Sequence, residues 1–396
     1  MKLFQPRRAA TACLLMLACT HAWGLESTIS ARYRGEAAGH FQDTTPPAAF
    51  CVRWPVMCQG GGAAALPISF VKSSTRGASD PRDQFFIKLP GRREIDVYHL
   101  QTGESHRLTI EFTAVGQSVY ERTLNYNPVF NASLQGGCST NQAWGYPSQP
   151  SYAMYLWNIR NPQSPAACNS TSWRAPAGYV ATGEVKEMGV RYNLQMPAPY
   201  RMKPGIYTGS SAFSVGPGGD FDFGNGVTEL NGNSLTINFE LDVEHAFFFD
   251  FAPGSERAVL EPREGWQAWM GGGRAPQRLY RDLPFRIWST GPFKAYKLCQ
   301  HYMDQKCGIR NTQGDLVPVD VALSLPAGIQ HGNQPVQRLT LPSGRGAPLQ
   351  FESAMPTLNR PGQLHFEVDR AGVQAMLQHP GSTYTGQVTV VFDAEL

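Results

Sequence analysis

His379-Pro-Gly-Ser-Thr-Tyr-Thr-Gly-Gln-Val-Thr-Val-Val-Phe392 is the stretch that decides the fold of the second half of this chain. From Tyr384 onward, one set of alternate positions is apolar or small and the intervening set is mostly polar. This period of two predicts a half-buried β-strand. Its inward positions are Tyr384, Gly386, Val388, Val390 and Phe392. We expect no later segment to cover the free edge, which must then pair with an earlier strand or accept a strand from another polypeptide.

This ending resembles the last strand of pilus subunits of the chaperone–usher pathway, whose Ig-like domains lack their final strand. The span 258–396 is similar to the pilin domain of CblD-like pilus biogenesis initiators, relatives of the tip adhesin of colonization factor antigen I fimbriae. The matching segments are Gly271–Gly273, Lys297–Tyr302, Arg360–Leu364 and the terminal strand. Some relatives carry a second cysteine just before the Pro-Gly step, where this sequence has Asn359 and Arg360.

The resemblance implies an all-β protein of two Ig-like β-sandwich domains, the C-terminal one an incomplete pilin domain that lacks its last strand. It implies a fimbrial tip adhesin that initiates pilus assembly and binds a receptor, a glycan by preference, on a host or abiotic surface. The implied partners are a periplasmic pilus chaperone, an outer-membrane usher and a major pilin subunit that donates a strand to the groove. The chain would pass through the periplasm to the cell surface, at the fimbrium tip.

The first 22 residues are typical of a secretory signal. Lys2, Arg7 and Arg8 precede a short apolar run at 9–18, and Thr20-His21-Ala22 is a plausible cleavage site. No other apolar run is long enough for a membrane helix. We therefore expect an exported mature chain in a compartment that permits disulfides.

Composition and length favour two β-domains. The chain has 40 Gly and 30 Pro, and only 16% of its residues are charged, which indicates many short strands joined by turns. A net charge of +3 is too weak to imply a nucleic-acid partner. We place the N-terminal adhesin domain at 23–251, a linker at 252–255 where Pro253-Gly254 ends an apolar run, and the C-terminal pilin domain at 256–396.

Alternating apolar residues predict strands in both halves, and one short helix is expected at 369–377. We interpret Thr28–Arg34 as the first strand of the adhesin domain; as a free donor arm it would instead indicate an internal pilus adaptor. The other strands are predicted near 66–71, 85–89, 95–100, 107–112, 153–157, 207–215, 235–243, 257–260, 317–325 and 364–368.

Six cysteines remain after the signal, and they fall into three close pairs. Six cysteines allow fifteen connectivities, but sequential pairing keeps each bridge inside one proposed domain. No Cys-x-x-Cys or Cys/His spacing typical of zinc is present. We expect three disulfides, formed by Cys51 with Cys58, Cys138 with Cys168, and Cys299 with Cys307.

Two groups of residues are candidates for receptor binding. Trp144 and Tyr146 stand in an aromatic stretch between two cysteines, and aromatic faces stack on sugar rings. The aromatics of the strand that follows are more simply interpreted as core. Arg92 and Arg93, with Arg53, suit bidentate contacts with sialylated or sulfated glycans, although a solvated turn is the simpler interpretation of Arg92-Arg93.

Enzyme motifs are not found in the sequence. It has no Gly-x-Ser-x-Gly elbow, no His-Glu-x-x-His and no phosphate loop, so we expect no catalytic residues, no metal and no cofactor. Asp220, Asp222 and Asn225 have the oxygen ligands that calcium prefers, but residues of these types are also ordinary turn formers, which we favour. Two alternatives to the adhesin stay open: a structural pilus adaptor without ligand, and a secreted carbohydrate-active β-sandwich protein.

Overall fold

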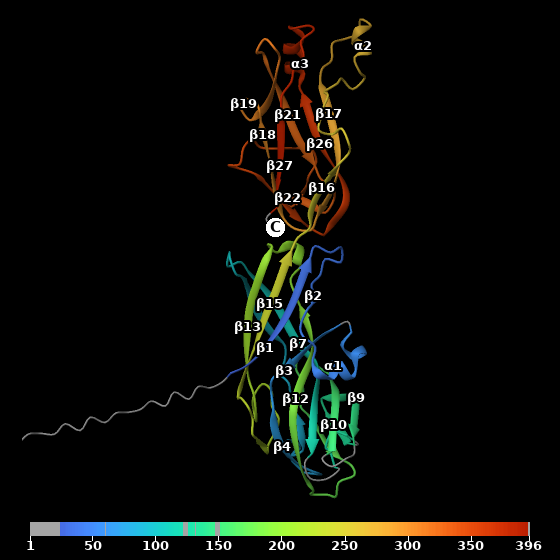
Figure 1. Cartoon of the computed structure of the whole chain (residues 1–396), viewed down its shortest axis with the longest axis vertical. Coiled ribbons are helices and arrows are strands. Elements are labelled where there is room, and N and C mark those ends of the chain that lie inside the picture. The colour runs from blue at the N-terminus through green and yellow to red at the C-terminus, as the bar shows by residue number, and fades with distance from the viewer. Residues whose placement is uncertain (1–23, 60, 122–125, 131, 147–150, 395–396) are drawn as a thin grey trace, which may run out of the picture.

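The computed structural model describes residues 24–394, except 60, 122–125, 131 and 147–150. Residues 1–22, which the sequence predicts to be a signal, lie outside this range. The described chain forms two all-β units, which lie end to end in Figure 1. The prediction of an all-β, two-domain protein is therefore confirmed. None of the described helices has the length and hydrophobicity needed to cross a bilayer.

The described residues of the N-terminal unit form fifteen strands, more than the seven to nine of an Ig domain. They are β1 (Leu25–Arg34), β2 (Gln42–Asp43), β3 (Gly62–Leu66), β4 (Phe70–Thr75), β5 (Phe85–Ile87), β6 (Arg93–His99), β7 (Ser105–Glu121), β8 (Ala132–Gly136), β9 (Cys138–Tyr146), β10 (Ser151–Ile159), β11 (Cys168–Ser172), β12 (Val180–Gln195), β13 (Gly205–Ser214), β14 (Val227–Thr228) and β15 (Ser234–Glu244). Short helices are α1 (Ala49–Arg53), η1 (Pro55–Cys58), η2 (Pro81–Asp83) and η3 (Pro199–Arg201).

Twelve of these strands form one sheet, in the order β14-β4-β12-β7-β6-β13-β15-β1-β2, with β3 on β12 and β10 between β7 and β9. Along one edge, β7 pairs first with β6 and then with β10. Along one edge, β12 pairs first with β4 and then with β3. Register shifts interrupt the β12–β7 pairing. Such changes of partner and bulges let a single sheet curl around its core. The remaining sheet has the order β5-β11-β8.

Strand β1 belongs to the N-terminal sheet along its whole length. It runs parallel to β15, from Leu25 opposite Leu235 to Arg34 opposite Glu244, and pairs antiparallel with β2 on its other side. Ile29, Ala31 and Tyr33 face the core and are buried. The interpretation of Thr28–Arg34 as the first strand of this domain is confirmed.

The C-terminal unit is a sandwich of two sheets around a second core. One sheet has the order β16-β17-β26-β21-β20-β19, with β24 on β21, and the other has the order β23-β22-β25-β18-β27. Its elements are β16 (Phe247–Phe251), α2 (Gln267–Met270), β17 (Leu279–Ser289), β18 (Phe293–Cys299), β19 (Tyr302–Met303), β20 (Lys306–Arg310), β21 (Leu316–Ser324), β22 (Ile329–His331), β23 (Gln334–Pro335), β24 (Leu339–Thr340), β25 (Leu349–Ser353), β26 (Thr357–Val368), α3 (Arg370–Leu377) and β27 (Val388–Asp393).

The passage between the two units differs from the expected linker at 252–255. β16 pairs antiparallel with β17, from Phe247 opposite Ser289 to Phe251 opposite Phe285. It is therefore part of the C-terminal sheet, and we propose that the boundary lies at His245–Ala246. The Pro253-Gly254 break shows where the apolar run ends, but it does not show which sheet the run joins.

Two other local predictions were wrong and one is confirmed. Residues 66–71 are not one strand, because β3 ends just before Pro67, which has no N–H to donate to a ladder. Residues 257–260 form no strand; Glu261, just after the segment, makes an isolated bridge to Tyr280. The short helix is confirmed as α3, where the Asp369 side chain caps the helix by accepting a hydrogen bond from the Gly372 N–H at 2.9 Å.

All three predicted disulfides are present: Cys51–Cys58, Cys138–Cys168 and Cys299–Cys307. The first closes the α1–η1 segment into a tight loop. The second joins the start of β9 to β11, and the third joins β18 to β20. Each bridge lies inside one unit, as expected.

The α1–η1 loop covers the outer face of the N-terminal sheet. Phe50 of α1 is buried against Gly116 of β7, where a Cβ atom would lie 2.7 Å from the Phe50 ring and 2.9 Å from the Tyr155 carbonyl oxygen. The loop explains why β10 is buried on both faces, with Tyr155 toward the main core and Leu156 toward α1. The interpretation of this strand as core agrees with the structure.

We predict that Gly116→Ala lowers the free energy of unfolding of the N-terminal unit by roughly 1–3 kcal/mol, because the added methyl group overpacks the contact with Phe50. Gly346→Ala is the matched control, since a Cβ atom there meets nothing within 4 Å. Chemical denaturation of the purified mature chain, with both variants, checks the prediction. Equal stability of the two variants would contradict the described packing of α1.

Candidate functional site

An open apolar groove runs along the C-terminal unit between β16 and β27. Among the described strands, β16 pairs only with β17 and β27 pairs only with β18. The two strands are the last members of their sheets, so each has a free edge where a further strand could hydrogen-bond. Figure 1 shows both strands in the unit that carries the C-terminus.

The groove encloses about 720 Å³. Its floor comes from the strands between the two edges, and its rims come from β16, the segment after it, and β27. The apolar side chains that line it are Phe249, Phe251, Leu260, Leu283, Ile309, Val319, Leu364, Phe366, Val388, Val390 and Phe392. Most of those on the rims and on β20 are only partly buried, whereas Val319 is 2% exposed.

The terminal segment contributes most of its predicted face to this groove. Gly386, Val388, Val390 and Phe392 line it, as the period of two indicates. Tyr384 does not; its hydroxyl accepts a hydrogen bond from Asn311 Nδ2 at 3.3 Å. The regular strand also begins at Val388, later than expected; before it, Thr385 makes an isolated bridge to Arg310 of β20, and Gln387 is hydrogen-bonded to Gln300, just beyond the end of β18.

Aromatic contacts join the two rims of the groove. The rings of Phe249 on β16 and Phe392 on β27 have centroids 4.1 Å apart. Phe251 lies 5.3 Å from Phe285 on the neighbouring β17. The rims therefore meet at the Phe392 end of β27, and the groove extends from there toward Gly386.

A second candidate site lies on the outer face of the N-terminal sheet. We call it the aromatic row, defined as Arg53, Trp144, Tyr152, Tyr120 and Lys186. The Arg53 guanidinium carbon lies 3.9 Å from the Trp144 ring centroid, and the Lys186 ammonium lies 5.0 Å from the Tyr120 ring centroid. Between these cations, ring centroids are 5.6 Å apart for Trp144 and Tyr152 and 4.7 Å apart for Tyr152 and Tyr120.

Strand register places these rings side by side. Tyr152 of β10 lies directly opposite Tyr120 of β7. Trp144 of β9 lies opposite Met154, which is two residues after Tyr152 and on the same face of β10. Aromatic side chains on one face reach both direct and diagonal neighbours across strands. Arg53 comes from the last position of α1, which the nearby Cys51–Cys58 disulfide holds over the sheet.

The structure thus brings Arg53 and Trp144 together, whereas Arg92 and Arg93 have other partners. Arg92 lies 3.7 Å from Glu111, and Arg93 is hydrogen-bonded to Asp220 at 2.6 Å. These ion pairs fit the interpretation as solvated surface arginines. Tyr146 is the last residue of β9, with its backbone opposite Tyr152.

Sequence reasoning missed Tyr120, Tyr152 and Lys186 as members of this site. Tyr152 was assigned to the core together with its strand, but it is only half-buried at the edge of the face that α1 covers. Tyr120 and Lys186 belong to β7 and β12, which are far from Trp144 in the chain. No local pattern marks such cross-strand neighbours.

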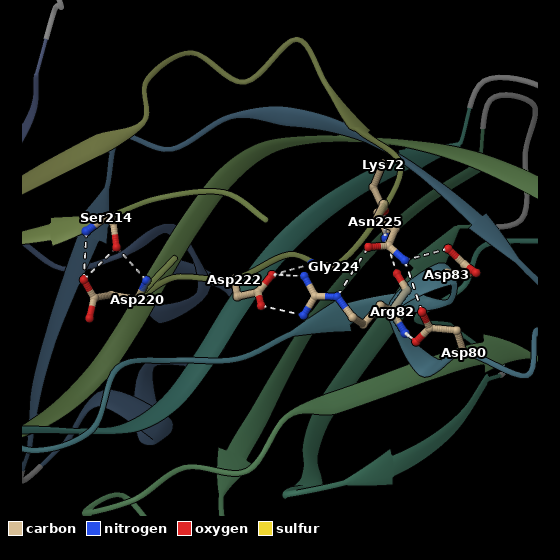
Figure 2. A network of polar contacts seen from close by, with 9 residues as sticks. All are labelled: Lys72, Asp80, Arg82, Asp83, Ser214, Asp220, Asp222, Gly224 and Asn225. Atoms are coloured by element: carbon tan, nitrogen blue, oxygen red, sulfur yellow. Dashed lines mark hydrogen bonds and ion pairs between the residues drawn. The ribbon is translucent and has the colours of Figure 1, made fainter. Parts of the chain in front are cut away.

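The Asp220–Asn225 turn has protein partners for its oxygen atoms. Figure 2 shows the Arg82 guanidinium facing the Asp222 carboxylate, with N···O distances of 2.7 and 3.0 Å. Asp220 accepts hydrogen bonds from the N–H and the hydroxyl of Ser214. Burial acts to raise the pKa of Asp222, but hydrogen bonds from Arg82 and Gly224 outweigh it and hold the pKa below its usual value. No group of three or more metal-ligating side chains occurs among the described residues, and the turn interpretation agrees with these contacts.

Lys72 on β4 is buried next to this network, beside Asn225. It is 1% exposed, and its ammonium group donates hydrogen bonds to the backbone carbonyls of Arg82, at 2.9 Å, and Asn225. Burial lowers the pKa of Lys72 to about 8, although Asp83 and other nearby carboxylates oppose the shift. The ammonium group therefore anchors the turn from the buried side.

Comparisons with known proteins give structural similarity only. No protein-family model and no curated protein matches the chain. One solved structure, the CsuC–CsuE chaperone–tip adhesion subunit pre-assembly complex from archaic chaperone–usher Csu pili of Acinetobacter baumannii, is similar at 10% identity over 93% of this chain and 99% of that one, with a TM-score of 0.20. A second, BspA_C_mut, has 8% identity over 83% of this chain and 95% of that one, with a TM-score of 0.16. Scores this low do not establish a shared fold, so the functional interpretation depends on the groove and the aromatic row.

We predict that Lys72 makes the N-terminal unit more stable as pH rises from 8 to 10.5. In this window the unfolded chain keeps a proton on Lys72, whose usual pKa is 10.5, while the folded chain has lost it. The stability of the wild type relative to Lys72→Met should rise by roughly 2–3 kcal/mol, at about 1.4 kcal/mol for each pKa unit. Denaturant titrations at several pH values measure this difference, with the exposed Lys88→Met as control. A difference that does not change with pH would refute it.

Proposed function

We propose that this chain is a subunit of a surface fibre that assembles by strand addition, and that it acts as the adhesin at the fibre tip. The observation that carries the proposal is the groove between β16 and β27, which combines two free strand edges with an apolar floor. Main-chain hydrogen bonds to an edge supply affinity for an added strand, and pockets for alternate side chains set its register.

The dimensions of the groove fit one extended segment. The stretch from Gly386 to Phe392 spans roughly 23 Å at about 3.3 Å per residue. A segment of this length would place three or four alternate side chains between the sheets. Each buried Val, Leu or Ile contributes roughly 1.5–3 kcal/mol, so the inserted strand would stabilise the whole unit.

The proposed occupants follow one another during assembly. A periplasmic pilus chaperone would cover the groove first, and a donor strand from the major pilin would replace it at an outer-membrane usher. The sequence resemblance to CblD-like pilus initiators supports this order and a location on the cell surface. The first described strand supports the tip position, because β1 is paired on both sides within its own sheet and is not a free donor arm.

The N-terminal unit is then the receptor-binding domain. The aromatic row supports this role, because it places exposed cationic side chains beside partly accessible aromatic rings on a rigid sheet. An adaptor without a ligand is the second candidate, and it would be favoured if no receptor binds this unit. Nothing in the described site geometry favours the carbohydrate-active enzyme.

We predict that the mature chain, expressed in the periplasm, is recovered well only with a co-expressed pilus chaperone and as a one-to-one complex. The reason is the exposed apolar groove, which favours aggregation when it is empty. Soluble yield and co-purification measure the outcome. A stable monomer obtained in good yield without any partner would contradict the interpretation of the C-terminal unit as an incomplete sandwich. It would favour a free-standing lectin that joins no fibre.

We further predict that Val390→Arg abolishes the complex, because it places a charge among the groove's apolar side chains. Thr389→Arg is the matched control: this neighbouring residue of β27 is exposed and does not line the groove. Co-purification of both variants with the chaperone gives the comparison. Similar recovery of the two complexes would show that the partner does not enter this groove.

A further inference from the structure

We infer that the aromatic row is the receptor site and that its ligand is an acidic glycan, an oligosaccharide carrying a carboxylate or sulfate group that binds at Arg53. The inference rests on the proposed function, since it names the site and ligand class of the proposed adhesin domain. Its test is independent of fibre assembly.

The surroundings of Arg53 are the main evidence that the ligand carries a negatively charged group. No carboxylate of the described residues lies within ion-pair distance of its guanidinium, whereas Arg92 and Arg93 both have acidic partners. Stacking on Trp144 at 3.9 Å holds the guanidinium plane in place. The N–H groups at its edge are then available for a bidentate bond with a planar carboxylate or a sulfate.

The opposite end of the row is less suited to an acidic group. The Lys186 ammonium lies 3.7 Å from Glu184, which already balances part of its charge. Glu187 accepts a hydrogen bond from the Ser118 hydroxyl at 2.7 Å, beside Tyr152. The charge of the row therefore changes from positive at Arg53 to mixed at Lys186, which predicts an acidic group at the first end only.

The middle of the row suits the uncharged part of a glycan. Tyr152 and Tyr120 are half-buried, so their rings are fixed by the sheet while part of each remains accessible. Sugar rings present apolar C–H faces that pack on such surfaces, and their hydroxyl groups can bond to the exposed Glu187 carboxylate nearby. From β9 to β12 the row crosses three strand spacings, roughly 14 Å at about 4.8 Å each, which fits a short oligosaccharide rather than one sugar.

The test measures glycan binding by the full mature chain, purified as its chaperone complex or alone if it is stable alone. The probes are a sialylated trisaccharide with its asialo counterpart, and a heparin-derived hexasaccharide with its desulfated counterpart. We expect binding of at least one acidic probe, with affinity at least tenfold above its neutral counterpart. The two pairs distinguish a carboxylate from a sulfate.

Variants locate the site. Arg53→Gln should weaken acidic-probe binding about tenfold, equal to about 1.4 kcal/mol, and Arg53→Lys should restore only part of it because the planar fork is lost. Tyr152→Leu should weaken binding of the whole glycan. Arg107→Gln, which changes an exposed arginine of β7 that is paired with Glu94 and Asp96 and lies outside the row, is the matched control and should bind as the wild type does. Recovery and circular dichroism of each variant confirm folding.

Three outcomes would overturn the inference: no binding of any probe, equal binding of acidic and neutral probes, or binding that Arg53→Gln and Tyr152→Leu leave unchanged. Equal affinity for an acidic peptide of the same charge would overturn the glycan as ligand class. Co-purification with the chaperone is scored on the same samples, so a failure of the fibre-subunit proposal is seen separately from a failure of glycan binding.

Discussion

The one-sided pairing of β27 is the constraint on which the C-terminal unit depends. This strand bonds to β18 and presents its other edge to the groove, where β16 provides the opposite rim. A sandwich closed at this place would hide Val388, Val390 and Phe392 completely. Because it is open, part of the core remains accessible, and the unit has an apolar surface that an added strand of matching alternation can bury.

In the N-terminal unit, one face of the large sheet packs on the main core, and part of the other face must also be covered. The disulfide-closed α1–η1 loop covers part of it, and Phe50 fits there because Gly116 and Gly189 leave room for its ring. Where the loop ends, Arg53 lies on Trp144 and the aromatic row begins. The same loop therefore completes a small core and presents a cation beside half-buried aromatic rings.

Polar side chains in this unit mainly position the backbone. Arg82 and Ser214 occupy the carboxylates that resembled a calcium site, and Lys72 bonds to the carbonyls beneath them. Charged groups paired in this way stabilise a turn and offer little to a ligand. Arg53 differs because its neighbour is an aromatic ring and not an acid, which leaves its hydrogen-bond donors for another molecule.

The sequence by itself determined the features that depend on neighbours in the chain. Alternation identified the all-β class and the groove face of β27, spacing identified three disulfides, and Asp369 marked the start of α3. Only the tertiary structure decided which strands meet: that β16 joins β17, that β27 keeps a free edge, and that Trp144 lies between Arg53 and Tyr152. A period of two shows which face a residue occupies, but its partner across the sheet comes from a distant segment, and that choice is made by the packing of the whole core.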